Sequence, residues 1–322
     1  MIKCIPILFL LFSHNVLAAG FCESYENVNT DVISYPAAGD PSYPAGGNPD
    51  LLDDCEFAPD GYEIIIYEFG MCTQAPAAPT GASAADTTTN CEVIYQSDAG
   101  EAFNLAVGAS FNMEGAEKPA NGTYTYGYVI MANTFGITLS QEFGNVMEGI
   151  GAGSGQGNFC YSSANTVDGS TGYHVSNSGT LASGPEDYVT CGASAGQAIK
   201  ITETLDVFGC DGPAAVPGNC EFTASAPTSD GQMTAYLVNQ ASASGALVSD
   251  NFLSNPLLAA DRLIGFLQWT TPVIITDSTS EADMQFSVNN GTSPQLFPPS
   301  SGADYDIFSF GSGPFSVNIA VQ

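Results

Sequence analysis

Short runs of β-branched and aromatic residues, separated by Gly, Pro, Asn, Asp and Ser, recur along the whole chain. This pattern is typical of all-β proteins, in which short strands are joined by tight turns. The clearest run is Tyr62–Phe69 (YEIIIYEF), which follows the turn signal Pro59-Asp60-Gly61. Further strands are predicted over residues 92–96, 102–107, 122–132, 136–143, 198–208, 232–238, 263–269, 273–276, 284–288, 307–310 and 315–321. We expect a disulfide-stapled antiparallel β-sandwich of jelly-roll or immunoglobulin-like type, with little helix.

The region around Asn133 predicts a β-hairpin, because strand-like residues flank it on both sides. Three tyrosines alternate with smaller residues in the first of these strands: Tyr124, Tyr126 and Tyr128. A strand has a side-chain period of two, so the three rings should share one face. Together with Trp269 they are candidate residues for stacking against a glycan. Burial in a core is the alternative interpretation of the same alternation.

The chain divides less clearly into domains. We expect residues 19–322 to form one sandwich region with a Gly-, Ser- and Cys-rich insertion at about 145–225. Within that insertion every second residue of 149–157 is glycine, which predicts a flexible loop. Because the cysteines end at Cys220, two consecutive β-domains, 19–225 and 226–322, are the alternative.

The first eighteen residues resemble a secretion signal. Lys3 supplies a positive start, residues 5–12 (IPILFLLF) form a short apolar stretch, and Ala18 suits a cleavage site. That stretch is too short to span a membrane. We therefore expect a secreted protein that is periplasmic, on the outer surface or extracellular.

Cysteine usage agrees with an oxidising location. Removal of residues 1–18 would take Cys4 away and leave eight cysteines, an even number that favours disulfides. Zinc binding is disfavoured because the chain has no C-x-x-C pair. We expect sequence neighbours to pair, giving Cys22–Cys55, Cys72–Cys91, Cys160–Cys191 and Cys210–Cys220.

Charge restricts the partners. The chain holds 4 Lys and Arg against 34 Asp and Glu, a net charge of −30, and only Lys118, Lys200 and Arg262 would remain after signal removal. Three basic residues cannot neutralise a phosphate backbone, which excludes nucleic acid as a partner. Anionic membrane surfaces would repel the protein, and phosphorylated substrates would find no arginine clamp. Cationic partners and divalent cations are favoured instead.

Two acidic clusters make calcium the expected ligand, because this ion prefers oxygen donors on flexible backbone. One cluster surrounds Cys55 and the other lies between predicted strands. Their members are Asp50, Asp53, Asp54, Glu56 and Asp60 in the first, and Asp277, Glu281 and Asp283 in the second; Asp304 and Asp306 form a smaller third group. Solvated acidic turns are the alternative interpretation.

Catalytic chemistry has little support. His174 is the one histidine that would remain after signal removal, and no G-x-S-x-G elbow stands before a predicted helix. A glycoside hydrolase needs only two carboxyl groups facing one sugar. The pairs Glu63 with Glu68, and Glu203 with Asp206, lie on predicted strands, where solvated acids are the simpler interpretation. No catalytic residue is assigned.

Residues 55–72 (CEFAPDGYEIIIYEFGMC), followed by NGTYTYGYVI from Asn121, resemble uncharacterised secreted envelope proteins of marine planktonic bacteria. The resemblance covers about the first half of the secreted chain. It implies an exported envelope or surface protein and carries no functional residues.

These features favour a secreted, non-catalytic structural or interaction protein of the cell surface, of surface-layer, appendage or adhesin type. Its partners would be other envelope proteins, further copies of itself, or glycans. A calcium-assisted carbohydrate-binding sandwich is the alternative, followed by a glycoside hydrolase that uses carboxylates alone.

Overall fold

The computed structural model describes residues 26–27, 32–33, 58–80, 83–105, 110–111, 116–149, 155–163, 189–205, 209–210, 220–221, 223–228, 231–239, 246–247, 260–280, 282–288, 291–297, 307–312 and 316–321. All regular structure in these ranges is β-strand, and the mostly antiparallel sheets pack together. The predicted all-β, disulfide-stapled sandwich is thereby confirmed. Its assignment to the jelly-roll or immunoglobulin-like type stays a prediction.

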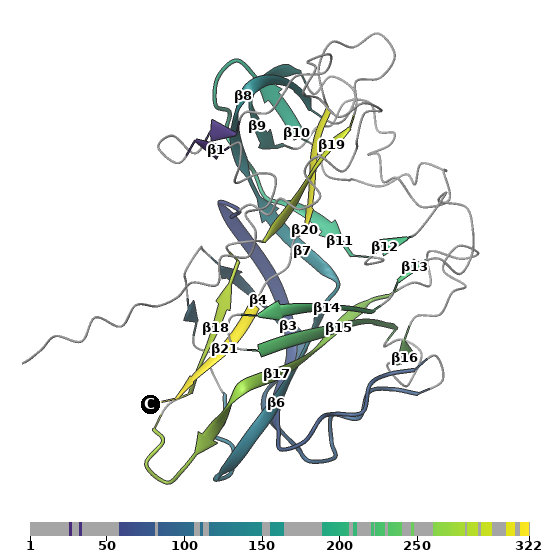
Figure 1. Cartoon of the computed structure of the whole chain (residues 1–322), viewed down its shortest axis with the longest axis vertical. Coiled ribbons are helices and arrows are strands. Elements are labelled where there is room, and N and C mark those ends of the chain that lie inside the picture. The colour runs from purple at the N-terminus through teal and green to yellow at the C-terminus, as the bar shows by residue number, and fades with distance from the viewer. Residues whose placement is uncertain are drawn as a thin grey trace, which may run out of the picture.

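A nine-stranded sheet fills the lower half of Figure 1. Its order is β11 (Ile201–Thr204), β7 (Thr134–Thr138), β3 (Gly61–Cys72), β6 (Gly122–Ala132), β17 (Arg262–Ile275), β15 (Gly231–Asn239) and β14 (Thr223–Thr228), with β4 (Cys91–Leu105) on β3 and β16 (Ala246–Leu247) on β15. β3 shows the expected period of two, since Tyr62, Ile64 and Ile66 are buried between partly exposed neighbours.

A seven-stranded sheet occupies the upper half of Figure 1. It contains β1 (Glu26–Asn27), β2 (Val32–Ile33), β8 (Ser140–Gly149), β20 (Ile307–Ser312), β19 (Thr292–Phe297), β9 (Gln156–Ser162) and β10 (Val189–Gly192). Two smaller sheets complete the described fold. They are β21 (Ser316–Val321), β18 (Ala282–Ser287) and β5 (Ser110–Phe111), and the pair β12 (Gly209–Cys210) and β13 (Cys220–Glu221).

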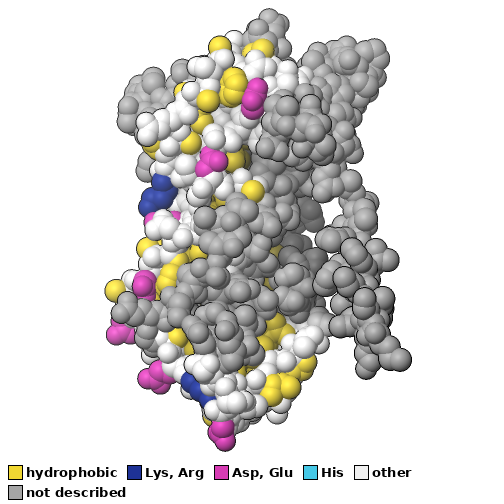
Figure 2. All heavy atoms as spheres, turned by 90° about the vertical axis from the view of Figure 1, so that its left-hand side faces the viewer, with side chains coloured by type: hydrophobic (Ala, Val, Ile, Leu, Met, Phe, Trp, Pro, Cys, Tyr) yellow, Lys and Arg dark blue, Asp and Glu magenta, His cyan; other side chains and the backbone are white. Residues whose placement is uncertain are grey.

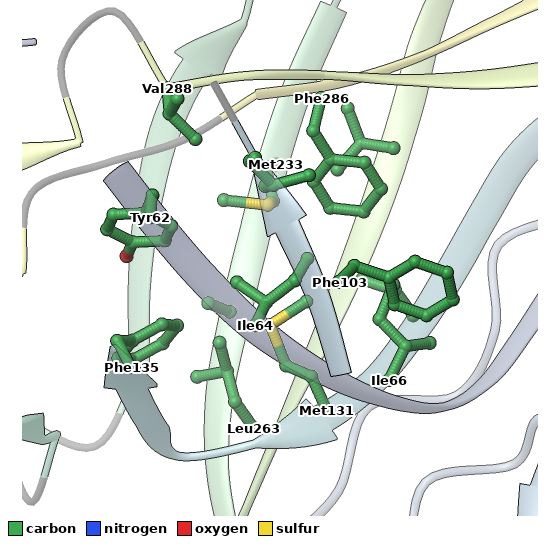
Figure 3. Packing of buried hydrophobic residues seen from close by; sticks show 14 of the residues in the cluster. Tyr62, Ile64, Ile66, Phe103, Met131, Phe135, Met233, Leu263, Phe286 and Val288 are labelled. Atoms are coloured by element: carbon green, nitrogen blue, oxygen red, sulfur yellow. The ribbon is translucent and has the colours of Figure 1, made fainter. Parts of the chain in front are cut away.

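The main core joins these sheets. Figure 3 shows Phe286 from β18 and the following Val288 over Met233 of β15 and Ile64 of β3. The same buried cluster includes Phe308 of β20, so it reaches into the upper sheet. Full burial of such a side chain stabilises the fold by about 1.5–3 kcal/mol.

The expected hairpin around Asn133 is wrong. β7 pairs antiparallel with residues 61–63 of β3, and β6 pairs antiparallel with residues 66–72 of the same strand. The two therefore run in the same direction, as one kinked strand. Asn133 is buried at the kink, and its side-chain amide donates to the carbonyl oxygens of Leu205 at 3.1 Å and Ala260 at 2.9 Å. These residues adjoin β11 and β17, which lie end to end along β7 and β6. Asn133 therefore satisfies backbone groups at a strand junction instead of forming a turn.

Strands far apart in sequence share sheets. β8 follows β7 after Leu139, and β9, β10 and β11, from the predicted insertion, pair with β8, β9 and β7 respectively. β15 and β17, which follow residue 225, lie in the same sheet as β3 and β6. The proposed domain boundaries themselves stay predictions.

Two predicted disulfides are present. Cys72–Cys91 joins β3 to β4, and Cys160–Cys191 joins β9 to β10, each between directly opposed residues. Such bonds indicate an oxidising location outside the cytoplasm. Within the described ranges, no helix has the length and apolar character needed to cross a bilayer.

The other two predicted bridges are not observed directly. The backbones of Cys210 and Cys220 lie opposite each other in β12 and β13, which is the register that a bridge would need. Their disulfide stays a prediction. Cys22 and Cys55 fall outside the described residues.

Candidate functional site

A shallow pocket of about 270 Å³ lies on the outer face of β8 and β9, partly open to solvent. The residues that line it are Ser140, Gln141, Glu142, Phe159, Cys160, Tyr161, Ala195 and Gly196. We call this feature the β8–β9 pocket.

Strand register explains the pocket's side chains. Ser140 lies opposite Tyr161, and Glu142 lies opposite Phe159, in the antiparallel pair β8–β9. Opposed residues of neighbouring strands present their side chains on the same face. Phe159 and Tyr161 are each half-buried, whereas Cys160 between them is 1% exposed and bonds to Cys191 beneath the rings. The result is two aromatic rings beside one carboxylate and one hydroxyl, on a sheet fixed by a disulfide.

The pocket wall is the segment that follows β10. Ser162 anchors it, because its hydroxyl donates to the carbonyl oxygen of Ile199 at 2.6 Å and accepts from Leu139 N at 3.1 Å. Ile199 N donates back to Ser162 O at 2.9 Å. Gly196 lies against the Tyr161 ring so closely that a Cβ there would be 2.0 Å from Cζ. A glycine at this position therefore lets the wall contact the ring.

The polar atoms of the pocket are mainly acceptors. The Ser140 hydroxyl donates to the Asp60 carboxylate at 2.7 Å, and the Gln141 amide donates to the carbonyl oxygen of Glu142 at 2.9 Å. Glu142 is the only charged side chain among the residues that line the pocket. The carboxylates of Glu142 and of Asp60, which bonds to Ser140, make the electrostatic potential in the pocket negative.

The predicted glycan-stacking residues lie in the core. Tyr124, Tyr128 and Trp269 are 2%, 0% and 7% exposed, and Tyr126 is partly buried. The rings do not share one face either, because Tyr124 belongs to the main core whereas Tyr126 and Tyr128 belong to a second cluster with Phe266. The register between β6 and β17 shifts between Gln268 and Val273, which reverses the alternation beside Tyr124.

The second cluster is covered by the loop that Cys72–Cys91 closes. The low-complexity sequence of this loop predicts that it is exposed to solvent. Instead, Pro76 and Pro79 are buried and Ala85 packs against the cluster. The Thr87 hydroxyl also hydrogen-bonds to Tyr128. Two isolated β-bridges inside the loop pair Ala77 with Asp86 and Thr80 with Ser83. The described part of this loop therefore shields aromatic rings from solvent.

Buried tyrosines take the place of cations as partners of several carboxylates. Tyr128 donates to Glu68 at 2.6 Å, and burial together with this bond raises the tyrosine pKa. Burial and the Glu101 carboxylate raise the pKa of Tyr95 to about 12. Burial and Glu92 raise the pKa of Tyr124 to about 12. Tyrosine hydroxyls thus satisfy acidic side chains on β3 and β4.

Each basic residue in the described ranges has a structural contact. Lys200 Nζ lies 2.8 Å from both carboxylate oxygens of Glu63, and Lys118 Nζ donates to Thr276 O at 2.7 Å. The Arg262 guanidinium lies over the Tyr67 ring, with its carbon 3.7 Å from the centroid. On the face shown in Figure 2, Lys and Arg form isolated spots and no patch.

The expected calcium ligands are only partly described. Asp60 contacts Ser140, Asp277 accepts a bond from Asn121, and Asp283 lies in β18. Most of the acidic candidates and the histidine considered for catalysis fall outside the described residues: Asp50, Asp53, Asp54, Glu56, Glu281, Asp304, Asp306 and His174. Among the residues that are described, no three His, Cys, Asp or Glu side chains gather as a metal site would require.

Sequence reasoning overlooked Phe159 and Tyr161. They alternate around Cys160 in the sequence NFCYS, and this period of two was the available signal. Comparison with known proteins adds no function, because no protein-family model, no curated protein and no solved structure matches this chain.

Proposed function

We propose that this chain is a secreted, non-catalytic interaction protein of the cell surface, and that it binds other envelope proteins through the β8–β9 pocket. The observation that carries the proposal is the partly exposed pair Phe159 and Tyr161 beside the Glu142 carboxylate. Aromatic side chains dominate the binding energy of protein interfaces. The Cys160–Cys191 bond holds these rings on a rigid sheet, which lowers the entropy that binding must cost.

Three of the described edge strands, β14, β19 and β4, favour binding at the pocket over assembly by strand addition. β14 and β19 contain Pro227 and Pro294, and a proline cannot donate to a further strand. β4 bulges at residues 97–100, where its register with β3 shifts, and Tyr95 bonds to Glu101 across the bulge. Prolines and bulges are the devices by which natural edges avoid further pairing.

The test compares binding of purified protein to intact cells of the organism that produces it. The double variant Phe159→Ser/Tyr161→Ser should bind at least about tenfold more weakly than the wild type. Val146→Ser is the matched control, because Val146 is a 39% exposed apolar residue of β8 that does not line the pocket. Equal binding by all three proteins, or recovery of the natural protein only from inside cells, would overturn the proposal.

Carbohydrate binding is the second candidate, favoured by the same two rings, which could stack on a sugar. Calcium binding stays a prediction attached to this candidate. Most of its predicted ligands, including Asp50, Asp53, Asp54 and Glu281, lie outside the described residues. A glycan array read with calcium and then with a chelator tests both at once. Hydrolysis has less support, because one carboxylate lines the pocket and Asp60 reaches it only through Ser140.

A further inference from the structure

We infer that the β8–β9 pocket takes the ammonium group of a lysine side chain from a partner protein, with Glu142 as its counter-ion and Phe159 and Tyr161 as its aromatic walls. This inference rests on the proposed function and adds the chemical class of the group that is recognised.

Hydrogen-bond chemistry is the first support. The Ser140 hydroxyl donates to Asp60 and one N–H of Gln141 donates to the backbone of Glu142, so beside the amphoteric Tyr161 hydroxyl the pocket presents the acceptor oxygens of Glu142. An ammonium group carries three donors and no acceptor, which complements such a lining. An anionic ligand, such as a carboxylate or a phosphate, would be repelled by the Glu142 carboxylate.

Charge is the second support. The chain carries −30 overall, and Lys200, which follows Ile199 of the wall segment, is held by both oxygens of Glu63. Among the described residues, Lys118 and Arg262 contact Thr276 O and the Tyr67 ring, so none of the three basic side chains pairs with Glu142. Cations close to aromatic rings gain further stabilisation when partly removed from water.

Size is the third support and favours a side chain over a larger ligand. Pockets that bind drug-sized molecules measure about 300–1,000 Å³ and enclose most of the ligand. The β8–β9 pocket, at about 270 Å³ and open on one side, is smaller and more accessible. It suits one long side chain that projects from the surface of a partner. Lysine fits this description, because its flexible stem can lie along the rings while the ammonium reaches Glu142.

The test uses two probes that differ in one charge: Nα-acetyl-lysine methylamide and the same compound acetylated on Nε. Nuclear magnetic resonance of the Phe159 and Tyr161 rings reports binding at the pocket itself. We expect saturable shifts with the lysine probe and at least about tenfold weaker binding of the acetylated probe.

Matched variants separate local contact from general charge. Glu142→Gln should weaken the lysine probe about fivefold. Glu148→Gln makes the same charge change on the same strand, away from the pocket lining, and should leave binding unchanged. Both carboxylates are on β8 and neither is fully buried, so circular dichroism should confirm that both variants fold.

Each contrary outcome has a distinct meaning. Equal binding of both probes, or equal weakening by the two variants, would overturn the inference and leave the proposed function standing. Stronger binding of glucosamine than of the lysine probe would overturn the choice of a protein partner. If no probe shifts the rings while the double aromatic variant still loses cell binding, the inference fails alone. If cell binding also survives in that variant, both proposals fail.

Discussion

The two stapled edges of this protein are built alike and differ in what the chain does next to them. At β3–β4 and at β9–β10, a disulfide joins opposed cysteines of adjacent antiparallel strands, and tyrosine rings lie close by. In the lower sheet the disulfide-closed loop folds back and Tyr128 becomes 0% exposed. In the upper sheet Tyr161 stays partly exposed beside a pocket.

The comparison teaches that a staple and an aromatic residue do not make a binding surface by themselves. What decides the outcome is whether chain covers the ring. Glycine assists in both regions, since Gly70 lies against Tyr128 just as Gly196 lies against Tyr161. The first contact closes a core and the second shapes a pocket wall.

The largest expected difference follows from truncating the two rings. Tyr128→Ala should lower the free energy of unfolding by about 4 kcal/mol, because it leaves a cavity between the sheet and the loop. Tyr161→Ala should cost about 1 kcal/mol or less, since its ring is half-exposed. Urea unfolding followed by circular dichroism measures both. Equal losses would show that Tyr161 is also a core residue.

Removing the disulfides tests the staples themselves. Cys72→Ser/Cys91→Ser and Cys160→Ser/Cys191→Ser should each lose about 3 kcal/mol. The loops span 19 and 31 residues in sequence separation, which favours the second bond by only about 0.4 kcal/mol in loop entropy. Calorimetry of each double variant provides the measurement. Stability losses that differ by several kcal/mol would mean that one bond also stabilises native packing.

The two glycines offer a smaller, matched pair. Gly70→Ala should cost about 2 kcal/mol, because a Cβ there would lie 2.3 Å from the buried Tyr128 ring. Gly196→Ala should cost less than about 1 kcal/mol, since the half-exposed Tyr161 ring can move aside. Thermal unfolding compares the two proteins. The reverse order would contradict the distinction between a closed and an open ring.

Alkaline pH should lower the stability of the protein through two tyrosines of the main core, with no effect at neutral pH. The folded pKa values of Tyr95 and Tyr124 are about 12, above the unfolded value of about 10. Their contribution to stability is therefore complete below pH 10 and is lost as pH rises from 10 to 12, because the unfolded chain ionises first. Urea midpoints at pH 8 and pH 11 measure the fall. The variant Tyr95→Phe/Tyr124→Phe should show a smaller fall, and an identical one would refute the assignment.

Local pattern predicted the strands and the pairing of near cysteines well. β3 appears where YEIIIYEF predicted it, and the segments at 263–269 and 273–276 are the two parts of β17. Cys72–Cys91 and Cys160–Cys191 could be proposed because strands close in sequence are often neighbours in a sheet.

The candidate site could not be predicted, because it depends on coverage and register. Alternation alone cannot show that the described residues between Cys72 and Cys91 cover Tyr128, or that a register shift beside Trp269 moves Tyr124 into another cluster. Asn133 resembles a turn residue, yet its amide bonds to the backbone beside the ends of β11 and β17, two strands that are far apart in the sequence. Such long-range pairings leave no local signal.

Trp269 gives the protein a built-in optical reporter of its lower sheet. It is the only tryptophan of the chain, it is 7% exposed, and Gly127 leaves room for its ring. An indole in such apolar surroundings fluoresces at shorter wavelength than one in water. Its emission should therefore shift to the red when the nine-stranded sheet opens, and should stay constant when only the pocket residues change. One spectrum would thus distinguish loss of the scaffold from loss of the binding surface.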